Sequence, residues 1–380
     1  MRARQLSIVL LGGMLASIVA AAAARAEPYL TVRAGAKCSD CHTNLTGGGK
    51  RTPFPHIHAH DVLKDLQILP IPARSRAFDG QIHSHVSIGG DFRFRNTTVF
   101  VDDPDSSGKV PRDRVFRQEV DANDIDVNEF LLYLQIDLWP EVLSFYADED
   151  FDGGATNREA FGLLRGVLPL DGYVKAGRLF PAYGLRVHDD EAFIRARSGF
   201  TFETPDEGAE LGIAPGPFFL ATSITDGQEG DTDVQVTVNG YTVLEDLPVV
   251  RNALLGASYA RQSDKRWVAG FYGGANLWKF TYLAEFDLID DRTPQSLPAR
   301  DQFAAYAEVD WLLFEWLNVR GAFDFVKVAG DRDQVRYVIG LEPFIDKFLQ
   351  PRVQYRINNA PRNRPELNRA ELVFELHLWF

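Results

Sequence analysis

From about residue 83 to its end, the chain alternates apolar and polar residues with a period of two. The clearest segments are 130–138, 280–288, 303–311, 352–357 and 372–380. This period is typical of β-strands that have one apolar and one polar face. A soluble sandwich would also alternate, but its strands average five or six residues. Here many segments run about ten residues, with aromatic ends and charges in mid-strand, which is typical of lipid-facing barrels. The sequence predicts an all-β fold, a transmembrane antiparallel β-barrel.

The connections between these segments alternate in length. Short turns are predicted at 139–140, 168–171, 215–217, 245–248, 275–276, 314–315 and 346–347, and longer links at 98–125, 151–156, 184–205, 226–231, 262–264, 290–299, 329–331 and 359–366. This series gives about 16 strands, and 14 or 18 remain open because the pattern is weakest near 206–225 and 232–244. Short turns face the periplasm in such barrels, so an even count places both barrel ends on that side. The chain closes on Phe380, which resembles the terminal aromatic signal for barrel assembly.

The only two cysteines lie in the motif C-x-x-C-H, formed by Cys38, Cys41 and His42. Two thiols at this spacing can each bond one haem vinyl group, and the adjacent imidazole then ligates the iron. The alternatives are a thioredoxin-like redox pair, a structural disulfide or half of a zinc site. No βαβ pattern accompanies the motif and no second C-x-x-C exists to complete a zinc site. The motif predicts one covalent haem c with His42 as proximal ligand.

The first residues indicate export. Arginines precede an apolar run over 6–23, and the run ends in an A-x-A-like cleavage site at Ala26, typical of a secretory signal peptide. A retained N-terminal membrane helix is the alternative. We expect a signal peptide over 1–26, a monohaem cytochrome c segment over 27–80 and an outer-membrane, porin-like barrel over 81–380. The formal net charge of −13 argues against nucleic acid as a partner.

The second axial ligand is restricted by composition. Both methionines, Met1 and Met14, lie in the signal peptide, so the mature chain has no methionine thioether to bind the haem iron. We therefore expect one of His56, His58 and His60 to be the distal ligand; the alternative is a five-coordinate or water-ligated haem. The segment 27–80, called the leader below, is too small to bury a haem alone, so we expect the haem to lie inside the barrel.

The link 184–205 follows the fifth expected strand. Its charged residues are Arg186, His188, Asp189, Asp190, Glu191, Arg195 and Arg197. If the link folds into the lumen, these charges would form a selective constriction; otherwise it is a solvated outer loop. Acidic runs at 102–105 and 148–152 would attract cations such as ferrous iron, or hold divalent ions that bridge lipopolysaccharide.

The signal peptide, the single C-x-x-C-H motif near the mature N-terminus and the barrel closing on Phe380 together resemble the fused monohaem cytochrome–porins, which include the Cyc2-type iron oxidases. Residues 175–181 also resemble anion-selective porins. The resemblance implies residence in the bacterial outer membrane, among its lipid and lipopolysaccharide. It also implies electron transfer between an extracellular donor or acceptor, such as ferrous iron, and a periplasmic carrier such as a soluble cytochrome. A homo-trimer is possible by analogy with porins.

Whether the chain is an enzyme stays open, because no catalytic triad, P-loop or paired general acid and base is present in the sequence. Two other functions remain as alternatives. One is a solute porin whose haem-bearing segment is a periplasmic plug. The other is a periplasm-facing reductase anchored by the barrel.

Overall fold

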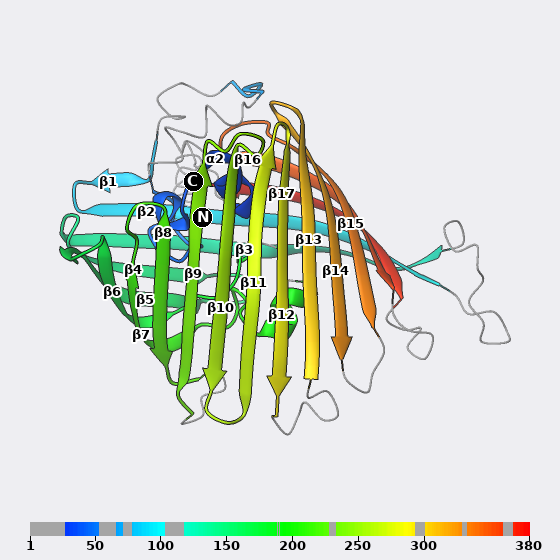
Figure 1. Ribbon diagram of the computed structural model, residues 1–380. Coiled ribbons are helices and arrows are strands. Elements are labelled where there is room, and N and C mark those ends of the chain that lie inside the picture. Colours follow the sequence, from blue (N-terminus) through cyan, green and yellow to red (C-terminus); the bar gives the residue numbers. More distant parts are fainter. Residues whose placement is uncertain are drawn as a thin grey trace, which may run out of the picture.

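The computed structural model describes residues 27–52, 66–70, 78–102, 118–187, 189, 191–227, 233–292, 301–328, 333–359 and 368–380, without the side chains of 101–102 and 118–122. Its strands β2 to β17 each pair antiparallel with the next, and β17 pairs back with β2 to close a barrel (Figure 1). The short β1 (Gln81–His83) pairs with the start of β2. The predicted antiparallel barrel of about 16 strands is confirmed.

The barrel strands are β2 (Val86–Asp102), β3 (Gln118–Trp139), β4 (Leu143–Asp150), β5 (Thr156–Leu168), β6 (Gly172–Leu179), β7 (Asp206–Ile213), β8 (Phe218–Thr225), β9 (Gln235–Glu245), β10 (Asn252–Gln262), β11 (Arg266–Leu277), β12 (Phe280–Asp291), β13 (Asp301–Phe314), β14 (Leu317–Val328), β15 (Gln334–Pro343), β16 (Leu349–Asn359) and β17 (Arg369–Trp379). The weakly patterned regions 206–225 and 232–244 form β7, β8 and β9, so the strand count does not fall to 14.

The alternation along each strand separates an apolar exterior from a polar lumen. On β17, Leu372 and Phe374 are exposed on the outside, whereas Glu375 and His377 are buried inside. Exposed apolar surface costs about 25 cal/mol per Å² in water, so this outer belt is stable only against lipid. The barrel is therefore an outer-membrane protein. Among the described residues, no helix is long and apolar enough to cross a membrane.

Several predicted connections differ from the structure in their limits, and two of them are instructive. The turn expected at 275–276 lies at Trp278 and Lys279, because Asn276 faces the lumen and its side chain donates a hydrogen bond to the carbonyl of Phe280. The asparagine supports the turn from inside instead of forming it. The link expected over 98–125 is shorter, because β2 runs to Asp102 and β3 starts at Gln118. Polar residues there extend the hairpin.

Residues 27–52 of the leader lie inside the barrel, at the end where the short turns are. Its helix α2 (Pro28–Ala34) begins with a proline and ends at Gly35 in the left-handed conformation, a common arrangement of helix ends. One side of α2 packs on β10, β11 and β12. Arg33 Nη2 donates to the carbonyl of Lys279 at 2.7 Å, and Asn252 Nδ2 donates to the carbonyl of Arg33 at 2.8 Å. The leader is thus attached to the barrel wall near its short turns.

Candidate cofactor site in the barrel lumen

The C-x-x-C-H motif forms a tight turn in the leader. Cys38–Cys41 is a single helical turn, α3, and Asp40 fixes its start: its Oδ2 accepts a hydrogen bond from the backbone N of Lys37, the residue before the turn, at 2.8 Å. Behind it the chain doubles back through three glycines, 47–49, all with positive φ. A Cβ at Gly49 would lie 2.1 Å from Tyr146 Oη, so only glycine fits there. The glycine run is a packed turn against the barrel wall.

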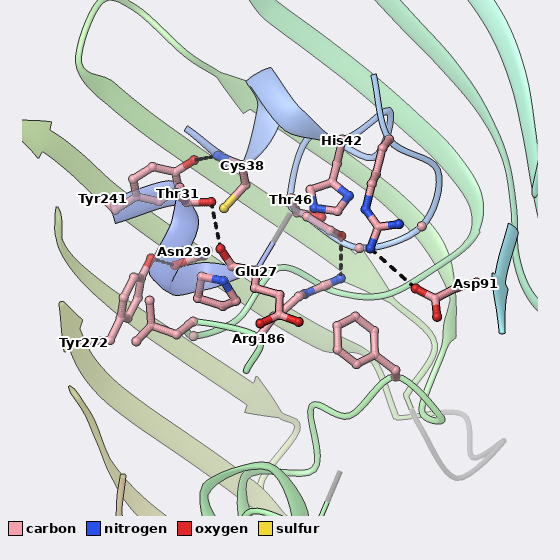
Figure 2. A pocket seen from close by; sticks show the side chains of 18 of the residues that line it. Glu27, Thr31, Cys38, His42, Thr46, Asp91, Arg186, Asn239, Tyr241 and Tyr272 are labelled. Carbon is pink, nitrogen blue, oxygen red and sulfur yellow. Dashed lines mark hydrogen bonds and ion pairs between the residues drawn. The ribbon is translucent and has the colours of Figure 1, made fainter. Parts of the chain in front are cut away.

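Cys38 and His42 both line a cavity inside the barrel, with about 910 Å³ of space that is not filled by atoms and is partly open to solvent. The lining comes from the leader (Glu27, Thr31, 47–49, Arg51), the wall (Asp91, Tyr133, Arg158, Asn239, Tyr241, Tyr272) and the link after β6 (184–186, Phe202). Figure 2 shows Cys38, His42 and Arg186 directed toward the same space. The site is therefore shared between the leader and the barrel.

The chemistry of the motif residues fits a covalently attached haem. The thiols of Cys38 and Cys41 are both free, and their i, i+3 spacing puts them on one side of α3. Burial lowers the pKa of His42 to about 3, helped by the charge of Arg51, so its imidazole is neutral and able to bind metal at pH 7. Its Nδ1 is buried without a hydrogen-bond partner among the described residues. Cys41, however, is not among the residues that line the cavity.

The distal ligand stays a prediction, because His56, His58 and His60 lie outside the described residues. No second histidine lines the described part of the cavity. His83 and His85 are exposed, on and beside the short strand β1. Within the described ranges, no group of three or more histidine, cysteine and acidic side chains is arranged to hold a metal ion.

A buried histidine on the last strand escaped the sequence reasoning. His377 of β17 faces the lumen with its Nε2 2.9 Å from Asp91 Oδ1, and its ring centroid is 4.3 Å from that of Trp379. Arg51 Nη2 lies 3.5 Å from the same aspartate, and its guanidinium lies over Trp379. The sequence could have indicated that His377 faces the lumen, since it alternates with the lipid-facing residues of the strand. This cluster borders the cavity through Asp91 and Arg51.

Polar contacts to distant strands fix the leader around the motif. Cys38 N donates to Tyr241 Oη at 3.1 Å. Asn44 Nδ2 donates to both oxygens of Glu159 at 2.9 and 3.0 Å, and its Oδ1 accepts from Lys175 Nζ at 3.0 Å. Asn44 is fully buried. These bonds come from β5, β6 and β9, so three strands of one part of the barrel wall hold the motif.

The link after β6 folds into the lumen, the first of the two alternatives for 184–205. It begins at 180 and contains α6 (Phe193–Ser198), which packs against β12, β13 and β14. The buried Asp189 accepts from Arg336 Nη2 at 2.7 Å and Nη1 at 3.1 Å, and Arg320 Nη2 lies 3.6 Å away. Glu191 pairs with Arg356 at 2.9 Å. These ion pairs fasten the loop to β14, β15 and β16; His188 and Asp190 lie outside the described residues.

A second, more polar cavity lies on the outer side of the first one. Its lining includes Asp150 and Thr156, at the outer ends of β4 and β5, and Glu203 of the inserted loop. Both cavities share Arg158 and Phe202, which therefore form the wall between them. The guanidinium of Arg158 lies 5.8 Å from the Phe202 ring centroid.

Comparison with known proteins supports the fold. No protein-family model and no curated protein matches the chain. Solved structures of outer-membrane proteins do match it. One is OmpT of Vibrio cholerae with loop L8 deleted, with a TM-score of 0.54 and 9% sequence identity, where the match covers 78% of this chain and 99% of that one. Others are OprB of Pseudomonas putida at low pH (0.54, 9%, 78% and 93%) and the outer membrane channel DcaP of Acinetobacter baumannii (0.51, 9%, 78% and 97%). At such identities the likeness shows a porin-like outer-membrane barrel.

Proposed function

We propose that this protein transfers electrons across the outer membrane through one haem c held inside its porin-like barrel. Cys38 and Cys41 would carry the haem covalently, His42 would be its proximal ligand, and one of His56, His58 and His60 its distal ligand. The group would supply one-electron redox chemistry. The observation that carries the proposal is that Cys38 and His42 line one cavity enclosed by the barrel wall.

The depth of the cavity supports this role. Its lining reaches from Leu254, the third residue of β10 near the short turns, to Asn239 and Tyr241, the fifth and seventh of the 11 residues of β9. The apolar band of such barrels is about 25 Å tall, and electron transfer weakens steeply with distance. A single redox group near mid-height minimises the longer of the two distances to the membrane surfaces. A haem outside the barrel would need a second redox group to cover the rest.

The outer cavity suggests where an extracellular donor would approach. Carboxylates of Glu129, Asp150, Glu191 and Glu203 line it, which favours a cation such as ferrous iron, although arginines are present too. The acidic run 148–152 is divided: Asp148 is buried in the lumen. The run 102–105 lies outside the described side chains. On the opposite side, a periplasmic carrier such as a soluble cytochrome would receive the electron near the short turns. A homo-trimer surrounded by lipid and lipopolysaccharide stays part of the proposal.

The first test is covalent haem. We expect the protein, matured in a host that attaches c-type haem, to show a pyridine haemochrome spectrum and haem staining after denaturing electrophoresis. A variant with Cys38→Ala and Cys41→Ala should lose both signals while keeping the barrel folded. In intact cells, a membrane-impermeant reductant should then reduce the haem from outside. Protein without covalent haem, or haem that reacts only after the outer membrane is broken, would contradict the proposal.

A solute porin with a haem-bearing plug is the second candidate, favoured by the likeness to an outer membrane channel. The lumen argues against a wide pore, because the leader and the inserted loop both occupy it. Conductance in planar bilayers separates the two functions. A large, steady conductance of the unmodified protein would favour the porin, and a small one the electron conduit.

A further inference from the structure

One buried cation in the cavity has no anionic partner. Arg186 is 9% exposed, and its guanidinium donates to three backbone carbonyls: Gly47 at 3.2 Å, Phe180 at 2.8 Å and Pro181 at 2.9 Å. Within the described ranges, no carboxylate lies within 4 Å of it. The other two cavity arginines differ in this respect. Arg51 has Asp91 at 3.5 Å and Arg158 has a carboxylate at 4.0 Å.

The carboxylates that act on Arg186 from farther away are engaged elsewhere. Glu159 accepts from Asn44 Nδ2 and from Phe180 N at 3.0 Å. Glu210 accepts from Tyr173 Oη at 2.9 Å and pairs with Lys175. Burial therefore lowers the pKa of the Arg186 guanidinium in spite of them. A buried charge without a partner is costly, and three neutral acceptors compensate it only in part.

The backbone of Arg186 has a strained conformation, and contacts of the preceding residues hold it in place. Arg186 has φ +45°, a left-handed conformation that is unfavourable for residues other than glycine. The preceding amides are fixed to the barrel: Gly184 N donates to Ser258 Oγ at 2.9 Å, and Leu185 N donates to Glu285 Oε2 at 3.0 Å. Strain of this kind persists where the surroundings over-determine it, and it concentrates at ligand-binding sites.

We propose that Arg186 is an anion-binding residue which binds a carboxylate of the ligand in this cavity, namely a haem propionate. Three of the five N–H donors of the guanidinium are taken by the carbonyls of Gly47, Phe180 and Pro181, one on Nη1 and two on Nη2, which leaves one N–H on Nη1 and the N–H of Nε to donate to a carboxylate oxygen. Arg186 is then a positioning residue: it would hold the propionate ionised and couple the haem to the inserted loop. This inference rests on the proposed function for the identity of the ligand, but not for the anion site itself.

The test uses the holoprotein with Arg186→Gln, the conservative Arg186→Lys, and Arg261→Gln as matched control. Arg261 lies at the outer end of β10, is exposed and lines neither cavity. Spectroelectrochemistry from about pH 4 to pH 9 gives the ionisation linked to the haem midpoint potential. Removing the cation should raise the pKa of that ionisation by about 1 to 3. Arg186→Lys should restore most of the change, and Arg261→Gln should match the unmodified protein.

A second arm separates a propionate from a small free anion. Acetate is titrated into the unmodified protein and into Arg186→Gln, with calorimetry as readout. Acetate binding only in the unmodified holoprotein would keep the anion site but overturn the propionate. If covalent haem is absent, the proposed function fails, and the same titration on the haem-free protein still decides whether Arg186 binds an anion. Equal behaviour of Arg186→Gln and the unmodified protein in both arms, with heat-modifiable electrophoretic mobility showing a folded barrel, overturns the inference.

Discussion

Replacing Asp189 with alanine should release the inserted loop. The carboxylate is 4% exposed and takes both terminal nitrogens of Arg336, with Arg320 at 3.6 Å. Removing one partner of a buried pair costs about 3–5 kcal/mol, because the remaining charge is left uncompensated. Arg336 keeps Asp324 at 2.6 Å, so the lower figure applies. At 1.4 kcal/mol per tenfold, about 3 kcal/mol moves the ratio of fastened to released loop by roughly 100-fold.

Planar-bilayer conductance measures this release directly. We expect Asp189→Ala to show more frequent and larger openings than the unmodified protein. Asp264→Ala is the control, because its pair with Arg261 is exposed and worth at most about 1 kcal/mol. Identical open probability in Asp189→Ala and the unmodified protein, with both folded, would refute the reasoning.

The pH dependence of this fastening has a definite sign. Burial alone would raise the pKa of Asp189, but Arg336, Arg356 and Arg320 hold it well below its usual range. A carboxyl group with a depressed folded pKa stabilises the fastened loop above its ordinary value of about 3.9 and loses this effect as pH falls toward the lower folded value. The conductance of the unmodified protein should therefore stay constant from about pH 8 down to about pH 5. Openings that rise within this range would show that another group controls the loop.

Three further variants test the site. Gly49→Ala should lower both covalent haem content and thermal stability, because its Cβ would meet Tyr146 Oη. Gly153→Ala is the control: its φ is similar and nothing lies within 4 Å, so the strain of a left-handed alanine should lower the stability by only about 1–2 kcal/mol. Phe202→Ala should speed haem reduction by an impermeant reductant in intact cells, since it thins the wall between the cavities; an unchanged rate contradicts this. Asn44→Ala should cost about 1–3 kcal/mol in urea unfolding and expose the leader to protease, because Glu159 loses two buried hydrogen bonds.

The barrel could be predicted from sequence because its determinants are local. Alternation fixes which residues of a strand face lipid, and a one-residue slip would reverse every side chain. Residues such as Phe374 and Glu375 therefore signal their faces without knowledge of the partner strand. The predicted turn at 275–276 was wrong for a tertiary reason: Asn276 is a frequent turn residue, but here its side chain stabilises the following turn from the lumen.

The site could be predicted only where it is contiguous in sequence. Cys38 and His42 belong to one short motif, and the structure places both at one cavity. Arg186 was predicted only as one of several charged residues of a link expected either to line the lumen or to form an outer loop, without its place at this cavity, and Asp91 was not predicted as a site residue. Their roles depend on how far the inserted loop enters the lumen and on the register of β17 with β2, neither of which leaves a local pattern. His377 was visible only as one polar residue in an alternating strand.

The contacts of the leader explain how so short a segment could hold a large flat cofactor. A segment of this size buries too little surface to fold on its own. Its polar anchors instead reach residues far along the chain: Thr43 bonds Gln135 across 92 positions, and Cys38 N bonds Tyr241 across 203. The apolar side chains Tyr29 and Val32 join the same buried cluster as barrel residues. Because these apolar side chains of the leader pack on the lumen wall, contacts that hold the leader in place also hold the lining of the cavity in place. A ligand bound there would stabilise leader, loop and wall together, since all three contribute to its lining.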